Sequence, residues 1–446
     1  MVVVAARRLC NIMASASRPA AVASTPKWDS IVPTYAARTI RSPMRDDPLP
    51  PAKPNPQKRP IKLHLGDPSL GVLKPPQSAN NALKELIRND VYGGIHNCYG
   101  HTKGVEEIRA QLADQLTRQW GRCITADDVI FTNGCQHAIQ LTTASLCEEG
   151  SNVLVPQPGY PAEQVFLRPR RIEARYYQLR SDSSGAFVLD LDHLASLIDE
   201  KTSAVMLNNP SNPTGSVFPP AQLQELAALL QKHRLPLISD ELYAGLEFDE
   251  THLSAANFTP PIPTLLTDAI SKRYLVPGWR LGWIVRLDNE DGALQQVWSC
   301  LGRMAHTTNG PSRLAQAALQ VLLDQTPSAY FKHLRDHLQQ SASIVCRELN
   351  ACSGLQVVRP KGGTTCLLLL QEGAFGRLQT DKRGETASDA ELVDRFVVKL
   401  IEEESVSVHP GQGLHAPRGV RLNLCFAHDD LREACARIRD VCSRYA

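Results

Sequence analysis

The feature that most constrains this chain is the repeated alternation, in its central part, of short apolar runs with amphipathic stretches. Short apolar runs are typical of buried strands, and apolar residues spaced three or four positions apart are typical of helices. The expected strands are 129–131, 152–155, 203–207, 235–239, 265–270 and 281–285, and the expected helices between them include 106–120, 137–147 and 221–233. Apolar strands separated by helices predict an α/β fold, with a mostly parallel sheet flanked by helices.

The pattern changes after Pro311, where long helical periods replace the alternation. Helices are expected over 312–324, 329–350, 387–404 and 429–444, with a few strands between them. This predicts a second, smaller α+β domain. The expected division is an N-terminal extension and proline-rich arm over 1–59, a large domain over 92–325, and a small domain built from 60–91 plus 326–446. Residues 373–387, with Gly, Thr and mixed charges, are expected to form an exposed loop.

The two N-terminal segments are not expected to join either core. Residues 1–28 contain no Asp or Glu and are rich in Ala and Ser, a composition shared by mitochondrial transit peptides and disordered tails. The expected compartment is therefore the cytoplasm, or the mitochondrion if this segment is a transit peptide. Residues 48–60 contain six prolines, which favour extended backbone, so we expect a stiff linker or an arm. The folded body is expected to begin near Ile61.

Charge and composition exclude several classes of function. The 446 residues carry 48 Lys and Arg against 46 Asp and Glu, a balance that gives no reason to expect a nucleic-acid partner. The longest apolar runs, such as 366–370, fall far short of a membrane span. None of the 12 cysteines forms a C-x-x-C pair, and His333 and His337 lack the glutamate of a metalloprotease motif. We expect a reducing compartment, no membrane and no metal.

Polar residues that directly follow the expected strands are candidates for a binding site. In an open parallel sheet, ligands bind beyond the carboxyl ends of the strands, which meet at one edge. The first strand runs into a glycine turn at the start of a helix, where free amide groups can hold a phosphate. The residues that follow the strands are Gly134, Cys135, Gln136, Tyr160, Asn212, Asp240, Tyr243, Ser271 and Lys272.

Each of these residues alone has an ordinary structural interpretation, as a turn, a packed aromatic, a helix cap or a solvated lysine. Together they meet the needs of pyridoxal 5′-phosphate (PLP). Lys272 can hold the aldehyde as an imine, and Asp240 can keep the ring nitrogen protonated. Asn212 and Tyr243 can both donate to the ring oxygen.

Two arginines complete this constellation. Arg280 lies eight residues after Lys272, on a turn leading back into a strand, and can reach the phosphate. Arg421 lies on an apolar strand of the second domain, where an unpaired guanidinium would be costly to bury. Its planar fork suits the carboxylate of a substrate.

Three motifs carry a resemblance to a known family: 208–217, 239–245 and 272–283. They resemble the class I aminotransferases of the aspartate aminotransferase type (fold type I) and, within that class, the tyrosine aminotransferases. The resemblance extends over about residues 60–446. It implies PLP as cofactor, with Lys272 and Asp240 in the roles given above, Tyr160 stacked on the ring, and the phosphate held by the 134–136 loop, Ser271 and Arg280.

The resemblance also implies roles that the residues alone do not indicate. Gly66 matches a glycine whose backbone closes over the substrate, beside Arg421 and Asn212. Tyr99 matches a tyrosine that reaches the phosphate from the other subunit, which implies a homodimer with shared active sites. Two positions depart from the pattern. Ala269 replaces a phosphate-binding Ser or Thr, and the second arginine of dicarboxylate-specific relatives cannot be aligned near 303–309.

The implied activity is ping-pong transfer of the amino group of an aromatic L-amino acid, tyrosine favoured, to a 2-oxo acid such as 2-oxoglutarate, in amino-acid catabolism. A broad-range or alanine-type aminotransferase, a PLP-dependent lyase on the same fold, and a catalytically inactive binding module are alternatives. The residues leave open the preferred donor and acceptor, the acceptance of acidic substrates, cleavage of the first 28 residues, and the pathway.

Overall fold

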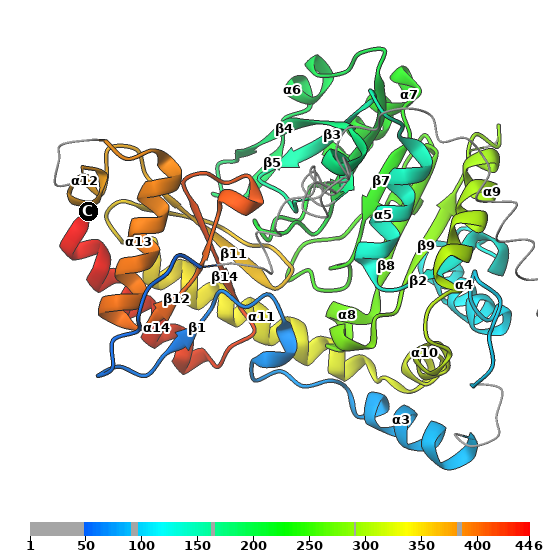
Figure 1. The fold of residues 1–446 in the computed structure, drawn as a ribbon, viewed down its shortest axis with the longest axis horizontal. Coiled ribbons are helices and arrows are strands. Elements are labelled where there is room, and N and C mark those ends of the chain that lie inside the picture. Colours follow the sequence, from blue (N-terminus) through cyan, green and yellow to red (C-terminus); the bar gives the residue numbers. More distant parts are fainter. Residues whose placement is uncertain (1–48, 91–96, 162–165, 290, 381–385) are drawn as a thin grey trace, which may run out of the picture. The chain divides into compact units, whose positions relative to one another are not determined.

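The computed structural model describes residues 49–90, 97–161, 166–289, 291–380 and 386–446 (Figure 1). All of them belong to one compact unit, Ile40–Ala446. The segment with the composition of a transit peptide lies outside the described residues. None of the helices in the described ranges is both long and apolar enough to cross a membrane.

The larger of the two main sheets has eight strands in the order β2-β9-β8-β7-β6-β3-β4-β5. Strands β8, β7, β6, β3 and β4 run parallel to one another, whereas β9 is antiparallel to β2 and β8, and β5 is antiparallel to β4. The strands are β2 (Val129–Thr132), β3 (Asn152–Gln157), β4 (Glu173–Ser181), β5 (Phe187–Leu189), β6 (Thr202–Asn208), β7 (Leu237–Asp240), β8 (Thr264–Ala269) and β9 (Gly282–Leu287).

Helices cover both faces of this sheet because its strands are apolar on both sides. Met206 of β6 packs in a cluster with Ile139 of α5 (Cys135–Leu146). Its neighbour Leu207 points to the other face and packs in a cluster with Leu226 of α7 (Pro220–His233). The expectation of a mostly parallel sheet flanked by helices is thereby confirmed.

A second, antiparallel sheet has the order β10-β11-β14-β13 and shares a core with the long C-terminal helices. A two-stranded parallel pair, β1 with β12, packs into the same core. These elements are β1 (Ile61–Lys62), α11 (Ser328–Leu349), β10 (Leu355–Val358), β11 (Thr365–Leu370), α13 (Asp389–Glu404), β12 (Val406–Ser407), β13 (His409–Pro410), β14 (Gly419–Asn423) and α14 (His428–Tyr445). The remaining helices are α3 (Gln77–Asp90), α4 (Glu106–Trp120), α6 (Leu191–Ser196), α8 (Ile270–Arg273), α9 (Gln295–Met304), α10 (Arg313–Gln325) and α12 (Gly376–Gln379).

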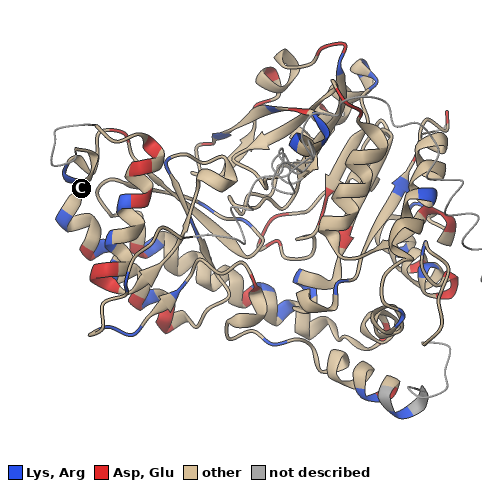
Figure 2. Ribbon diagram, in the orientation of Figure 1, with Lys and Arg blue, Asp and Glu red and all other residues tan. Residues whose placement is uncertain are grey.

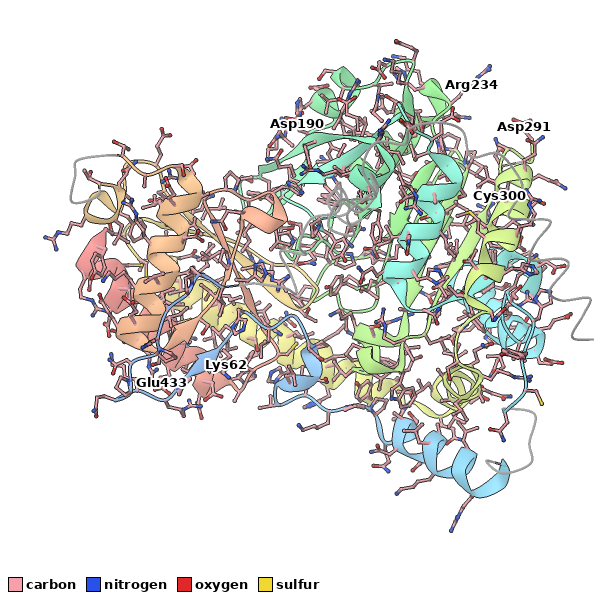
Figure 3. The ribbon with its side chains drawn as sticks, in the orientation of Figure 1. Lys62, Asp190, Arg234, Asp291, Cys300 and Glu433 are labelled. Atoms are coloured by element: carbon pink, nitrogen blue, oxygen red, sulfur yellow. The ribbon has the colours of Figure 1, made fainter. Side chains whose placement is uncertain are left out.

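The folded body begins earlier than predicted. The described part of the proline-rich arm lies against the small sheet's helices, where Asn55 donates to the Glu403 carbonyl at 3.0 Å and Leu49 packs against the core. Arg59 pairs with Asp430 and with Glu433 of α14, the latter labelled in Figure 3, and the surface of this helix carries charges of both signs (Figure 2). Paired polar groups, together with a partly buried apolar residue, therefore anchor this segment as an arm.

The prediction of an exposed loop over 373–387 is also partly wrong. Its described residues contain the short helix α12, and the side chains of Phe375 and Leu378 are buried in the core of the small sheet. Phe375 packs edge-on against Phe396 of α13, with the ring centroids 5.2 Å apart. These two apolar side chains pack the segment into the core, and Arg395 of α13 donates to the Leu378 carbonyl at 2.8 Å.

Candidate active site

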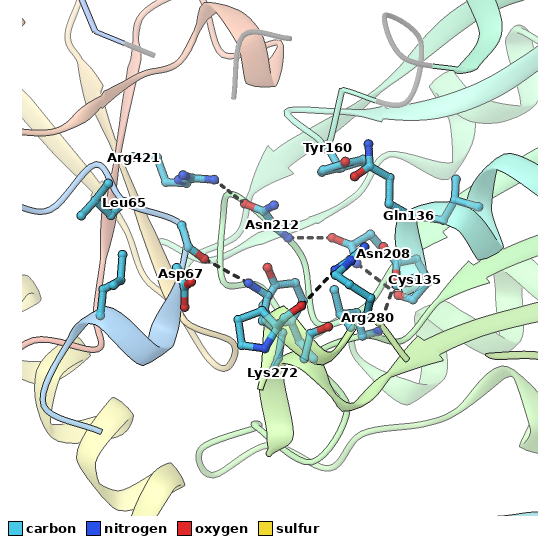
Figure 4. Close-up of a pocket in the computed structure, with 18 of the residues that line it drawn as sticks. Leu65, Asp67, Cys135, Gln136, Tyr160, Asn208, Asn212, Lys272, Arg280 and Arg421 are labelled. Carbon is cyan, nitrogen blue, oxygen red and sulfur yellow. Dashed lines mark hydrogen bonds between the residues drawn. The ribbon is translucent and has the colours of Figure 1, made fainter. Parts of the chain in front are cut away.

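The carboxyl ends of β3, β6, β7 and β8 face a cavity of about 410 Å³ (Figure 4). Segment 64–67, Leu70 and one residue of β14 line it as well. The cavity brings together most of the predicted site residues: Gly66, Cys135, Gln136, Tyr160, Asn212, Asp240, Tyr243, Ser271, Lys272, Arg280 and Arg421. The sequence expectation that strand ends would meet at one edge is therefore met by the structure.

Lys272 lies in α8, the single helical turn that follows β8. Its Nζ donates a hydrogen bond of 3.0 Å to the carbonyl oxygen of Gly66 and lies 5.8 Å from the centre of the Tyr243 ring. The amine thus stands between the strand ends of the large sheet and the segment before α3.

Asp240 is the last residue of β7 and is 6% exposed. One carboxylate oxygen, Oδ1, accepts from the Leu242 amide at 3.1 Å and from the Cys135 thiol at 3.4 Å. Burial raises the pKa of Asp240 to about 7, although these two hydrogen bonds oppose the shift. A cation placed beside this carboxylate would favour its ionised form.

The start of α5 and the Arg280 guanidinium present groups that suit an anion, and we call them the cradle. No side chain caps this helix, and Gly134 precedes it with a φ of 80°. A Cβ at Gly134 would lie 2.5 Å from Nη2 of Arg280, so only glycine leaves room for the guanidinium. Arg280 is held there by hydrogen bonds from Nη2 to the Asn133 carbonyl at 3.0 Å and from Nη1 to the Pro277 carbonyl at 3.2 Å. Amide groups at a helix start and a fixed guanidinium suit a phosphate.

The loop after β6 places an amide beside this cradle. The Asn212 backbone amide donates to Oδ1 of Asn208 at 2.7 Å, and the Asn208 side chain donates to the Asp240 carbonyl at 3.1 Å. Tyr243 stays a phenol, because burial raises its pKa. Asn212 and Tyr243 therefore present donor groups to the same cavity.

Arg421, on β14, is 3% exposed. Nη1 donates to Oδ1 of Asn212 at 3.3 Å and Nη2 to the His64 carbonyl at 3.4 Å, while Nε has no hydrogen-bond partner in the described structure. Burial lowers the pKa of Arg421 to about 10, a value that still leaves the group charged at neutral pH. A buried guanidinium that meets only neutral oxygens suits an anionic ligand.

Two predicted residues do not line the cavity. Gly134 lies just outside it, under the Arg280 guanidinium. Tyr99 is 89% exposed, and its role therefore stays a prediction. Ala269, the departure noted in the sequence, is buried and absent from the lining, whereas Ser271 takes part.

Sequence reasoning missed the remaining lining residues, which are His64, Leu65, Asp67, Leu70, Ile139, Asn208, Leu242 and Pro277. Asn208 ends a strand and could have been found by the same rule as Asp240. The others lie close in the sequence to predicted residues or have apolar side chains. Neither property marks a residue in the sequence as part of a binding site.

A family model described as aminotransferase class I and II matches residues 58–438. The chain belongs to this family. The aminotransferase is 36% identical over 394 residues to tyrosine aminotransferase of Caenorhabditis elegans, over 88% of this chain and 80% of the relative. The solved tyrosine aminotransferase of Leishmania infantum superposes with a TM-score of 0.83 at 28% identity, over 96% of this chain and 100% of that one.

The aminotransferase also shares its fold with aspartate aminotransferase of Thermus thermophilus, with a TM-score of 0.72 at 24% identity over 86% of this chain and 92% of that one. The family depends on PLP. The residues present fit this cofactor: the cradle under Arg280 suits its phosphate, and the buried Asp240, without an ion-pair partner in the described structure, suits its ring nitrogen.

Proposed function

We propose that this aminotransferase moves the amino group of an aromatic L-amino acid, tyrosine favoured, to a 2-oxo acid such as 2-oxoglutarate in a ping-pong cycle. The observation that carries the proposal is Arg421, a buried guanidinium in a cavity otherwise walled in part by Leu65, Leu70 and Ile139. The arginine suits an α-carboxylate and the apolar side chains suit an aromatic ring. The tyrosine aminotransferases among its relatives support the same donor.

In this proposal the cavity residues hold PLP by three of its groups. The amides of 134–136, Ser271 and Arg280 bind the phosphate, and Asp240 binds the protonated ring nitrogen. Asn212 and Tyr243 donate to the ring oxygen, while Tyr160 stacks on the ring. Bound PLP supplies a ring that takes up the electron pair left on Cα when its proton is removed.

Two residues then act on the substrate. Arg421 binds the α-carboxylate, with Gly66 and Asn212 beside it, and this fixes the direction of the Cα–H bond. Lys272 would hold PLP until the amino group of the substrate takes its place, and its freed Nζ would then move the proton from Cα to the carbon that was the aldehyde of the cofactor. General acid–base work of this kind contributes roughly 10²- to 10⁴-fold to rate.

The assembly and domain assignments belong to the same proposal. Tyr99, exposed in the isolated chain, contacts the phosphate of the partner's site in a homodimer with shared active sites. Residues 92–325 form the PLP-binding domain, and 60–91 with 326–446 form the small domain. The protein acts in the cytoplasm, or in the mitochondrion if residues 1–28 are a transit peptide.

The test is a donor panel with PLP-loaded protein and 2-oxoglutarate. We expect tyrosine, phenylalanine and tryptophan to give higher kcat/KM than alanine and aspartate, with one glutamate formed for each donor consumed. A preference for alanine or aspartate would contradict the aromatic assignment. Release of ammonia without new glutamate would indicate a lyase instead.

A further inference from the structure

A group of buried charged side chains adjoins the site residues in the chain but has no part in the proposed reaction. Glu241 directly follows Asp240, and Arg273 directly follows Lys272. We call this group the buried ion cluster; its members are Glu241, Glu247, His252, Asp268 and Arg273.

His252 is the centre of the cluster. Its Nε2 lies 3.2 Å from Oε2 of Glu241 and its Nδ1 lies 3.6 Å from Oε1 of Glu247. The Nδ2 of Asn209 lies 3.4 Å from the same Nδ1. The side chain of His252 is 11% exposed, so water contributes little to these contacts.

The three partners lie in three segments that carry site residues. Glu241 is fixed by Ser239 and by the Ala255 amide, at 3.0 and 2.8 Å, beside the end of β7. Glu247 accepts from the Gly245 amide at 2.9 Å, in the turn after Tyr243. One imidazole thus joins this turn to the end of β7.

The third segment is the loop after β6, which begins at Asn209 and contains Asn212. Oδ1 of Asn209 accepts from the Phe218 amide at 3.1 Å, so the amide orientation is set and Nδ2 must point to His252. When Nδ1 of His252 is unprotonated, it accepts this hydrogen bond. When Nδ1 carries a proton, it faces Glu247 as a donor, and two donors oppose each other at Asn209.

The charges around His252 come from several elements. Burial and Arg273 lower the pKa of His252, but the hydrogen bond and charge of Glu241 and the charge of Glu247 outweigh them and raise it. Arg273 of α8 is itself paired with Asp268 of β8 at 2.6 Å. The His252 imidazolium therefore loses its proton at a higher pH than an ordinary histidine does.

We propose that His252 is a positioning residue for the PLP site. It holds the segments that carry Asp240, Asn212 and Tyr243 in a fixed arrangement. Its protonation state decides whether Nδ1 accepts a hydrogen bond from Asn209 or donates a proton toward Glu247. This inference rests on the proposed assignment of those three residues to the cofactor.

The first test is a titration of PLP into apoprotein, followed by tryptophan fluorescence. We expect His252→Ala to raise the Kd of PLP at least tenfold, which is about 1.4 kcal/mol. His333→Gln, which alters an exposed histidine on α11, should bind PLP as wild type does. A Kd for His252→Ala within twofold of wild type would overturn the proposal.

The second test varies the pH. If His252 made only a structural contact, its replacement would weaken PLP binding equally at every pH. In wild type and His333→Gln the Kd should change by a step as pH passes through the His252 midpoint, since Nδ1 then exchanges Glu247 for Asn209 as its partner. His252→Gln keeps polar atoms but cannot be charged, so its Kd should keep the pH dependence that Asp240 contributes and lack this additional step. A Kd that changes with pH in His252→Gln by the same amounts as in wild type would be evidence against the proposal, even if His252→Ala fails to fold.

Neither test depends on which amino acid is the donor. Both tests can therefore be interpreted even if tyrosine is not the preferred substrate. Should both variants fail to fold, wild-type protein labelled with ¹⁵N-histidine decides. By linkage, PLP that senses His252 must shift the titration midpoint of that ring. Equal midpoints with and without PLP would refute the proposal.

Discussion

Arg421 and Asp240 are charged side chains that the fold keeps almost entirely from water, and neither pairs with an opposite charge in the described structure. Burying an unpaired charge costs several kcal/mol, so both positions favour a ligand of opposite charge. Both could be predicted, one from an apolar strand around an arginine and the other from a carboxylate at a strand end. The contact between Asp240 and Cys135 could not, because 105 positions separate the two residues.

For Arg421 we expect Arg421→Lys to lower kcat/KM roughly 10- to 150-fold for every donor with an α-carboxylate, because a lysine keeps the charge but loses the planar fork. Arg432→Gln, on the exposed face of α14, serves as the control. The Kd of PLP should not change. Equal losses in PLP binding and in turnover would instead place Arg421 in the cofactor site.

For Asp240 the raised pKa predicts a pH-dependent stability of the apoprotein. A carboxyl whose folded pKa is about 7 against 3.8 unfolded contributes stability below pH 4, and this contribution is lost as pH rises through 7. Asp240→Asn removes that charge, so its apoprotein should match wild type at pH 4 and exceed it by a few kcal/mol at pH 8. Thermal unfolding at both pH values measures this, and a constant difference would show that Asp240 does not titrate in this range.

At the scale of elements, the sequence predicted the buried strands well and the edge of the sheet poorly. Strands β6 and β7 are buried over nearly their whole length and contain the apolar runs Ala204–Leu207 and Leu237–Ile238, which stand out in the sequence. β4 was missed because only Tyr177 and Leu179 of its 9 residues are buried, and β5 was missed because it has only 3 residues. His252 was missed for a related reason, since it lies in a loop and its partners are set only by the assembled fold.

The turn between β2 and α5 gives a prediction at this scale. Gly134→Ala should raise the Kd of PLP at least tenfold, because the new Cβ meets the Arg280 guanidinium at 2.5 Å. Gly150→Ala is a matched control, with a φ of 88° and open space around its Cβ. Both should lose about 1 kcal/mol of stability to backbone strain, measured by denaturant unfolding. Unchanged PLP binding in Gly134→Ala would contradict the cradle.

At the scale of the whole molecule, the site draws on both sheets. Asp240 ends β7 of the large sheet and Lys272 lies in α8 directly after β8, whereas Arg421 belongs to β14 of the small sheet. Sequence periodicity predicted both bodies, because each buries its own apolar residues. Periodicity could not predict where Tyr99 lies, because its ring is exposed and is not part of an apolar pattern.

The shared-site proposal predicts complementation between two impaired variants. Tyr99→Ala should bind PLP weakly, and Lys272→Ala should be inactive. In a mixed dimer, one site has Lys272 from the first chain and Tyr99 from the second, so activity should return when the two are refolded together. Each variant refolded alone is the control. No gain on mixing would argue against a tyrosine supplied across subunits.

The arm over 49–60 makes its contacts with the far end of the chain. Asn55 meets Glu403 across 348 positions, and Arg59 meets Asp430 across 371. During synthesis the arm leaves the ribosome long before α13 and α14 exist, so the small half can close only after translation is nearly complete. Until then its apolar surface is open to chaperones and to premature association, and a stop codon ahead of α14 would leave Arg59 without its two partners on that helix.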